Sequence, residues 1–133
     1  MPVKCWDYGD KAGFVMLWLG TVKCGDDFEP EVYQYEVEFD LKDDVKEGRG
    51  AYLSMMTHGV DYSHNGIYIN GTKISNLTPQ GGGWGVDTFC IGPGNVHKGK
   101  NTFKITARND SGGTQGNIDD IRVRDPLLIY AVE

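Results

Sequence analysis

The chain has 133 residues, of which 39% are hydrophobic and 19 are glycine, and its formal net charge is −6 at pH 7. This length predicts a single domain, residues 1–133, with enough buried surface for a core. The acidic balance and the scattering of the 13 Lys and Arg residues argue against a nucleic-acid partner, because phosphate contacts need clustered cations. No apolar run approaches the roughly 20 residues of a membrane span, so we expect no membrane partner.

Alternation of apolar and polar side chains with a period of two is the main pattern along the chain, and it predicts strands. In chain order, strands are expected at 13–22, 32–39, 51–57, 67–74 (a hairpin), 86–91, 102–108, 117–123 and 127–132. The hairpin carries Asn70-Gly71, the strongest short-range signal for such a turn. Residues 40–50 are charged and are expected to form a loop. Short strands separated by turn residues predict an all-β fold, a two-sheet antiparallel β-sandwich.

The same alternation predicts the core. Its expected members are Phe14, Leu17, Val37, Phe39, Leu53, Ile67, Ile69, Phe89, Phe103, Ile105, Ile121 and Val123. The last strand, 127–132, is apolar on both faces. It is therefore either central in a sheet, covered on its outer side, or a contact surface through which the protein forms an oligomer or meets another chain.

The amino terminus lacks the apolar segment of a signal peptide. We therefore expect a cytoplasmic protein or a fragment of a secreted one. The cysteines, Cys5, Cys24 and Cys90, are odd in number and lack the spacing of metal ligands. Free buried thiols are expected, and a Cys5–Cys24 disulfide with Cys90 in the core is the alternative.

A run of short motifs between residues 51 and 123 resembles a known family. In order, these motifs are IYINGTKI, GGW, an F-x-I strand, GKNTFKITARN and NIDDIRV. They are similar to the second half of galactose-binding-like jelly-roll domains, in particular carbohydrate-binding modules of families 6 and 35. The resemblance implies a jelly roll that binds a carbohydrate, lectin-like and without catalysis, at a loop edge. The opening, MPVKCWDYGD, lacks the Glu-x-Glu strand with which the family helps to build a structural calcium site.

Five residues are candidates for ligand binding. Trp84 is flanked by glycines, so its ring is either a platform for the apolar face of a pyranose or a cap on the end of the sandwich. Tyr62 and His64 lie in the polar loop before the hairpin, where simple exposure is the alternative. Arg108 and Asn109 leave the strand 102–108 and offer fixed hydrogen-bond donors, or else Arg108 forms a salt bridge.

Acidic residues near the end of the chain suggest a Ca²⁺ site, since Ca²⁺ takes six to eight oxygen ligands. Asp119 and Asp120 would point to opposite sides of a strand, so one site cannot use both without a bulge. The expected ligands are Asp119 and Asn117, joined by Asp26 and Asp27 from an earlier loop. Solvation of these acidic loops is the alternative.

Catalysis has no motif in this sequence. A glycosidase needs two carboxylates at a set separation, and none of the acids is marked as such a pair; a nucleophile elbow is also missing. We therefore expect no enzyme. The leading hypothesis is a carbohydrate-binding module, and the alternative is a structural jelly roll that acts through protein–protein contacts.

Overall fold

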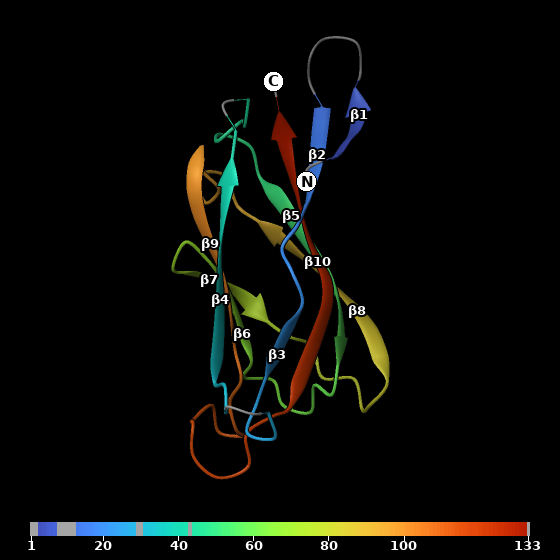
Figure 1. The fold of residues 1–133 in the computed structure, drawn as a ribbon, viewed down its shortest axis with the longest axis vertical. Coiled ribbons are helices and arrows are strands. Elements are labelled where there is room, and N and C mark those ends of the chain that lie inside the picture. Colours follow the sequence, from blue (N-terminus) through green and yellow to red (C-terminus); the bar gives the residue numbers. More distant parts are fainter. Residues whose placement is uncertain (1–2, 8–12, 29–30, 43, 133) are drawn as a thin grey trace.

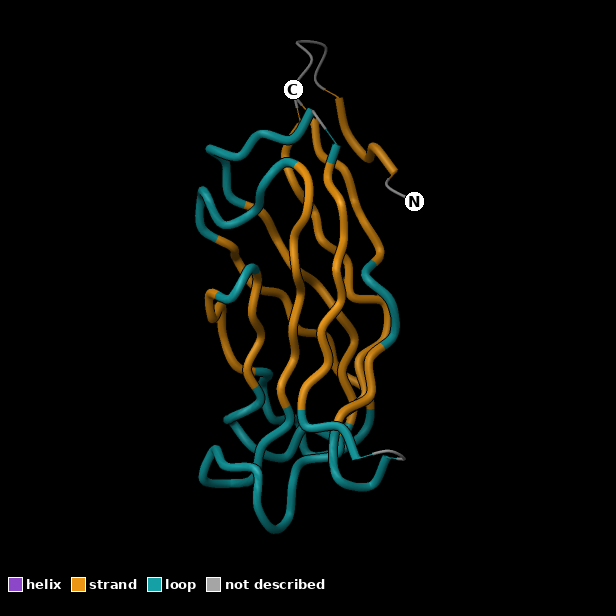
Figure 2. The backbone as a smooth tube through the Cα atoms, turned by 60° about the vertical axis from the view of Figure 1, so that its left-hand side comes forward, coloured by secondary structure: helices purple, strands orange, loops and turns teal. Residues whose placement is uncertain are grey.

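The structure, a computed structural model, describes residues 3–7, 13–28, 31–42 and 44–132. These residues form ten strands joined by loops (Figures 1 and 2). No helix in the described part of the chain is long and apolar enough to cross a membrane. The strands are β1 (Val3–Asp7), β2 (Gly13–Trp18), β3 (Val22–Cys24), β4 (Gln34–Leu41), β5 (Ala51–His58), β6 (Gly66–Ile69), β7 (Thr72–Asn76), β8 (Trp84–Ile91), β9 (Gly99–Thr106) and β10 (Ile121–Val132).

The strands form two antiparallel sheets. The larger sheet has the order β1-β2-β10-β5-β8, with β3 also paired to β10, and the smaller sheet has the order β4-β9-β6-β7. Figure 1 shows both sheets running along the long axis of the molecule, with the β4–β9 side on the left. Neighbouring strands come from distant parts of the sequence, as in a jelly roll. The two-sheet antiparallel sandwich that the sequence predicts is therefore confirmed.

The core lies between the sheets and agrees with the alternation of the strands. Nine predicted core residues are buried: Phe39, Leu53, Ile67, Ile69, Phe89, Phe103, Ile105, Ile121 and Val123. Leu17 and Val37 are only half-buried, and the side chain of Phe14 lies outside the described part of the structure. Each large apolar side chain buried in this way stabilises the fold by roughly 1.5–3 kcal/mol.

The predicted hairpin is confirmed. Asn70 and Gly71 connect β6 to β7 with φ angles of 50° and 79°, the left-handed conformation that this turn needs at both positions. The Asn70 amide also donates to the Asn95 carbonyl and to Asn101 Oδ1, each at 2.8 Å. The turn is thereby joined to the start of β9.

The last part of the chain differs from the prediction. Instead of two strands at 117–123 and 127–132, one strand, β10, runs from residue 121 to 132, and residues 117–120 are loop. A register shift against β5 falls between Arg124 and Leu127, where Asp125 has a φ of 49°. β10 lies between β2 and β5, so its expected central place is confirmed. On its inner face Leu128, Tyr130 and Val132 are buried, whereas Leu127 and Ile129 on the outer face are half-buried.

The cysteine predictions are only partly confirmed. Cys24 is a buried free thiol, and Cys90 is free but exposed. The Cys5–Cys24 disulfide and a core position for Cys90 were therefore wrong. The reason is the alternation of β8, which turns Phe89 and Ile91 inward and the residue between them outward.

Candidate functional site

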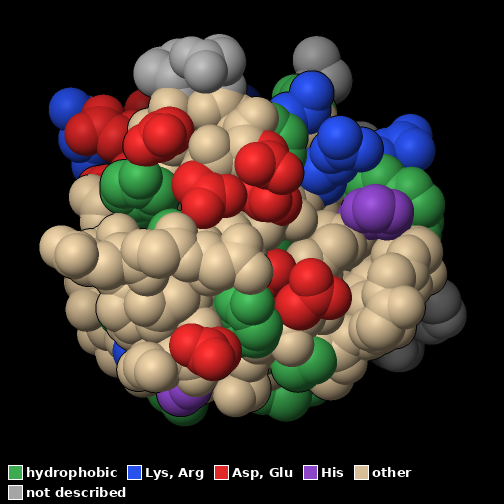
Figure 3. Space-filling view, turned by 90° about the horizontal axis from the view of Figure 1, so that it is seen from below, with side chains coloured by type: hydrophobic (Ala, Val, Ile, Leu, Met, Phe, Trp, Pro, Cys, Tyr) green, Lys and Arg blue, Asp and Glu red, His purple; other side chains and the backbone are tan. Residues whose placement is uncertain are grey.

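Loops from both sheets meet at one end of the sandwich, the lower end of Figures 1 and 2. They comprise residues 25–28 and 31–33 after β3, residues 59–65 after β5, and residues 107–120 before β10. Figure 3, which looks onto this end, shows several acidic side chains close together in the upper middle, further acids around them, and a group of basic side chains with a histidine at the upper right. These two regions are the candidate sites.

Asp119 holds the loops of this end together. Its Oδ2 accepts hydrogen bonds from the backbone N–H groups of Asp61 (2.9 Å) and Tyr62 (3.0 Å) and from the Asn65 amide (2.6 Å). Asn65 Oδ1 in turn accepts from the backbone N–H of Arg108 at 2.8 Å. Asp119 is only 3% exposed. Its Oδ2 serves the loop structure, whereas its Oδ1 is buried without a hydrogen-bond partner among the described residues.

Three other carboxylates do converge. Oxygen atoms of Asp26, Asp27 and Asp120 lie within 4.8 Å of one another, and we call these residues the acidic triad. Asp120 Oδ1 accepts a hydrogen bond from the backbone N–H of Asp27 at 2.9 Å. Loss of hydration raises the pKa of Asp120 to about 6, and the neighbouring charges of Asp27 and Asp26 add to this rise, although the N–H of Asp27 opposes it. A cation in this position would relieve the repulsion.

The predicted metal ligands are thus only partly brought together. Asp26 and Asp27 lie in the triad, but Asp120 stands where the sequence predicted Asp119. Asn117 is exposed, and its amide donates to the hydroxyl of Tyr62 at 3.1 Å. Asp119 and Asp120 contact different loops, as the sequence analysis expected, but they do so from a loop, because residues 117–120 are not a strand.

Trp84 begins β8 on the outer face of the larger sheet, beside the loop end. It is 43% exposed and pairs in register with His58 of β5, which pairs with Arg122 of β10. The rings of His58 and Trp84 are 5.1 Å apart at an interplanar angle of 52°. The guanidinium of Arg124 lies over the Trp84 ring, 5.4 Å from its centroid. The indole is therefore held in place but not covered.

A pocket of about 340 Å³ opens beside this ring. We call it the Trp84 pocket; it is lined by Thr21, Lys23, Trp84, Arg122 and Arg124. Sequence reasoning selected Trp84 but missed the three cations. The signal that could have found them is the alternation of IRVR at the start of β10, which places Arg122 and Arg124 on one face.

The other four candidate residues lie at the loop end. Tyr62 is half-buried, and His64 is exposed beside Gly112. Arg108 Nη1 donates to the carbonyl oxygens of Tyr33 (2.7 Å) and of its own neighbour Ala107 (2.8 Å). Among the described residues no ion pair joins Arg108 to an acid, so the salt bridge that was its alternative is not found there.

Asn109 closes its own loop. Its Oδ1 accepts from the backbone N–H groups of Ser111 (2.9 Å) and Gly113 (2.7 Å), and its amide donates to the Gln115 carbonyl (2.7 Å). Within the described residues, no hydrogen bond or ring contact joins Trp84 to Tyr62, His64, Arg108 or Asn109. Trp84 contacts His58 and Arg124 instead.

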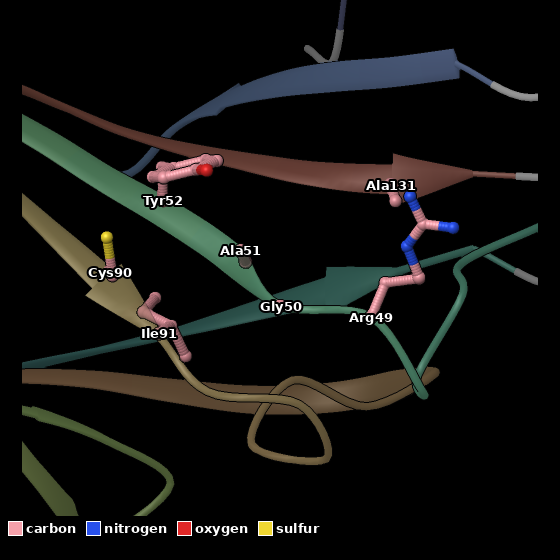
Figure 4. A pocket seen from close by; sticks show the side chains of 7 residues that line it. All are labelled: Arg49, Gly50, Ala51, Tyr52, Cys90, Ile91 and Ala131. Carbon is pink, nitrogen blue, oxygen red and sulfur yellow. The ribbon is translucent and has the colours of Figure 1, made fainter.

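A second pocket, of about 220 Å³, lies at the opposite ends of β5 and β8 (Figure 4). Tyr52 and Cys90, which pair across the two strands, contribute to it together with Arg49, whose side chain extends toward Ala131 in Figure 4. The lining is mainly apolar, with one cation. It lacks the convergence of charged groups that marks the Trp84 pocket.

Comparisons with known proteins find neither a matching family model nor a matching curated protein. Among solved structures, BuGH86 in complex with neoagarooctaose matches with a TM-score of 0.49 and 12% identity, over 92% of this chain but 19% of that one. A family 35 carbohydrate-binding module from Clostridium thermocellum matches with a TM-score of 0.44 and 14% identity, over 98% and 86% of the two chains. CBM35 from Paenibacillus barcinonensis matches with a TM-score of 0.39 and 21% identity, over 93% and 87%. With TM-scores below 0.5, these matches assign neither a family nor a ligand.

Proposed function

We propose that this chain is a non-catalytic carbohydrate-binding module with Trp84 as its platform. The observation that carries the proposal is a 43% exposed indole, fixed by contacts with His58 and Arg124 at the mouth of a pocket. An aromatic ring held in this way can bury the C–H groups of a pyranose, while polar groups around it accept or donate hydrogen bonds to hydroxyls.

The proposed binding site differs from the one that the sequence analysis expected. Arg108 donates to the Tyr33 carbonyl in the loop after β3, and Asn109 accepts from the N–H of Gly113 in its own loop, so both shape the loop end. Tyr62 and His64 keep exposed polar atoms there and remain candidates for contact with a longer ligand. A shallow site of this kind binds at about millimolar to micromolar affinity, roughly 4–8 kcal/mol.

The test is a titration of the protein with neutral and charged mono- and oligosaccharides, followed by calorimetry and by tryptophan fluorescence. Trp84→Ala is expected to weaken binding by at least about tenfold while the fold, checked by circular dichroism, is retained. The matched control is Trp18→Ala, which removes another exposed tryptophan, one that donates to Asp125. Binding that survives Trp84→Ala, or no binding to any saccharide, would contradict the proposal.

We also propose that the acidic triad holds Ca²⁺. The oxygen donors, their mutual approach and the raised pKa of Asp120 support a cation at this position. Bound there, Ca²⁺ would join the loop after β3 to the residues just before β10. Calorimetric titration with Ca²⁺ tests this idea, with Asp120→Asn expected to abolish binding and Asp61→Asn, at an exposed acid of the same end, expected to leave it unchanged. Equal Ca²⁺ binding by wild type and Asp120→Asn would exclude the site.

A further inference from the structure

Three cations gather at the Trp84 pocket on a chain whose net charge is −6. Lys23 of β3 and Arg122 of β10 are direct cross-strand partners, so their side chains leave neighbouring positions of one sheet face. Arg124 lies two residues further along β10 and therefore faces the same way. Like charges placed directly opposite each other destabilise a sheet, so the arrangement has a cost in the absence of an anion.

The described part of the chain does not itself neutralise these cations. Within the described residues, no carboxylate forms an ion pair with Lys23, Arg122 or Arg124. Asp125 follows Arg124 in the chain, but its carboxylate accepts a hydrogen bond from the indole of Trp18 at 3.2 Å. In Figure 3 several basic side chains group together at the upper right, next to the acidic side chains near the centre.

Aromatic rings hold the two guanidinium groups instead. Arg122 lies over the ring of Phe28, 5.9 Å from its centroid, and Arg124 lies over Trp84. Contacts of this kind orient a guanidinium while they leave its N–H donors free. The planar fork of an arginine matches a carboxylate or a sulfate through two parallel hydrogen bonds.

We propose that the Trp84 pocket binds an anionic saccharide, with the sugar ring on the exposed part of Trp84 and its carboxylate or sulfate ester between Arg122, Arg124 and Lys23. The inference rests on the proposed carbohydrate-binding function and adds the charge class of the ligand. A nucleic acid fits less well, because the cationic area is small and an acidic region lies at the same end, whereas a phosphate backbone needs an extended row of cations.

The experiment compares oligosaccharides of matched length that are neutral, carboxylated or sulfated, by calorimetry. At least one anionic series should bind about tenfold more tightly than the neutral one, and the two anionic arms distinguish a carboxylate from a sulfate ester. This preference should shrink when the salt concentration is raised from about 0.05 M to about 0.5 M.

Arg122→Gln should remove most of the preference for the anionic series, while binding of the neutral series changes less than about threefold. Arg124→Gln should also remove the preference, but it should weaken the neutral series as well, because Arg124 holds the Trp84 ring. Arg49→Gln, at the second pocket, is the matched control and should retain the preference. Neutral saccharides that bind through Trp84 as tightly as anionic ones would overturn this inference and leave the proposed function intact. Failure of all saccharides would overturn both, and equally tight binding of a single-stranded oligonucleotide would overturn the saccharide class.

Discussion

The amide of Asn65 donates a hydrogen bond of 2.6 Å to Asp119 Oδ2, and both side chains are buried. This pair connects the loop after β5 to the loop before β10, and Asn65 Oδ1 extends the connection to the backbone of Arg108. Burial of a carboxylate is costly unless it accepts hydrogen bonds, and Asp119 accepts all three of its hydrogen bonds at Oδ2, while Oδ1 has no partner among the described residues. Its three donors therefore define the geometry on which the neighbouring acidic triad depends.

Replacement of Asp119 by Ala should lower the free energy of unfolding by about 2–5 kcal/mol, because three donors would be left in a buried place without their acceptor. Urea denaturation measures this change. Asp110→Ala, at an exposed acid of the loop before β10, should alter the same quantity by no more than about 0.5 kcal/mol. Equal effects of the two substitutions would show that Asp119 has no such structural role.

The titration of Asp120 provides the second prediction. Its pKa is raised to about 6 by loss of hydration and by Asp27 and Asp26, whereas the unfolded chain should titrate near 4. Between these values the folded state binds more protons than the unfolded state, so its stability falls as the pH rises from about 4 to about 6. Above the folded pKa this contribution stays constant.

Thermal unfolding of the wild type and of Asp120→Asn in the presence of EDTA isolates this contribution. The variant should gain stability relative to the wild type as the pH rises through the window, because its amide never ionises but still accepts from the N–H of Asp27. With Ca²⁺ the order should reverse, since ionised carboxylates bind the cation more tightly at higher pH. A difference between the two proteins that does not vary with pH would refute the assignment.

The relation between Asp120 and Gly25 gives the third prediction. Gly25 has a φ of 138°, and a Cβ at this position would press against Asp120 Oδ1 and lie 2.7 Å from the Asp119 carbonyl oxygen. Gly25→Ala should therefore reduce stability by more than about 2 kcal/mol, from backbone strain and steric overlap together. It should also weaken any Ca²⁺ binding by displacing Asp120.

Gly20→Ala is the matched control, because Gly20 also has a positive φ, 98°, but an added Cβ would meet nothing within 4 Å. This substitution should lower the free energy of unfolding by about 1–2 kcal/mol, from backbone strain alone. The difference between the two variants in chemical denaturation therefore measures the overlap with Asp120. If the two variants lose the same free energy of unfolding, the close approach between residues 25 and 120 is not present in solution.

Part of the fold and of the candidate sites could be predicted from the sequence alone. Alternation with a period of two identified most strands and the inward residues, and Asn70-Gly71 identified the hairpin, because both are local signals. The sequence did not show that Asp120, and not Asp119, approaches Asp26 and Asp27, because the direction of a loop side chain depends on distant donors, such as the N–H of Asp27, 93 residues away. Local propensity carries no information about such contacts.

The sequence could likewise predict only part of the Trp84 pocket. Its cations come from β3 and β10, whose pairing places Lys23 opposite Arg122. The sequence shows that each side chain faces outward from its own strand, but it does not show which strands are neighbours. A cluster built across strands almost a hundred residues apart therefore required the structure.

Thiol reactivity gives the last prediction. Burial raises the pKa of Cys24 to about 12, an effect that Arg108 only partly offsets, whereas Cys90 is exposed. Because the thiolate is the reactive form, iodoacetamide at pH 8 should modify Cys90 in the native protein and Cys24 only after addition of denaturant. Peptide mass spectrometry distinguishes the two sites. Cys90 is six residues from Trp84 along β8, about 20 Å, so its modification should leave saccharide binding unchanged; rapid native labelling of Cys24 would disprove its burial.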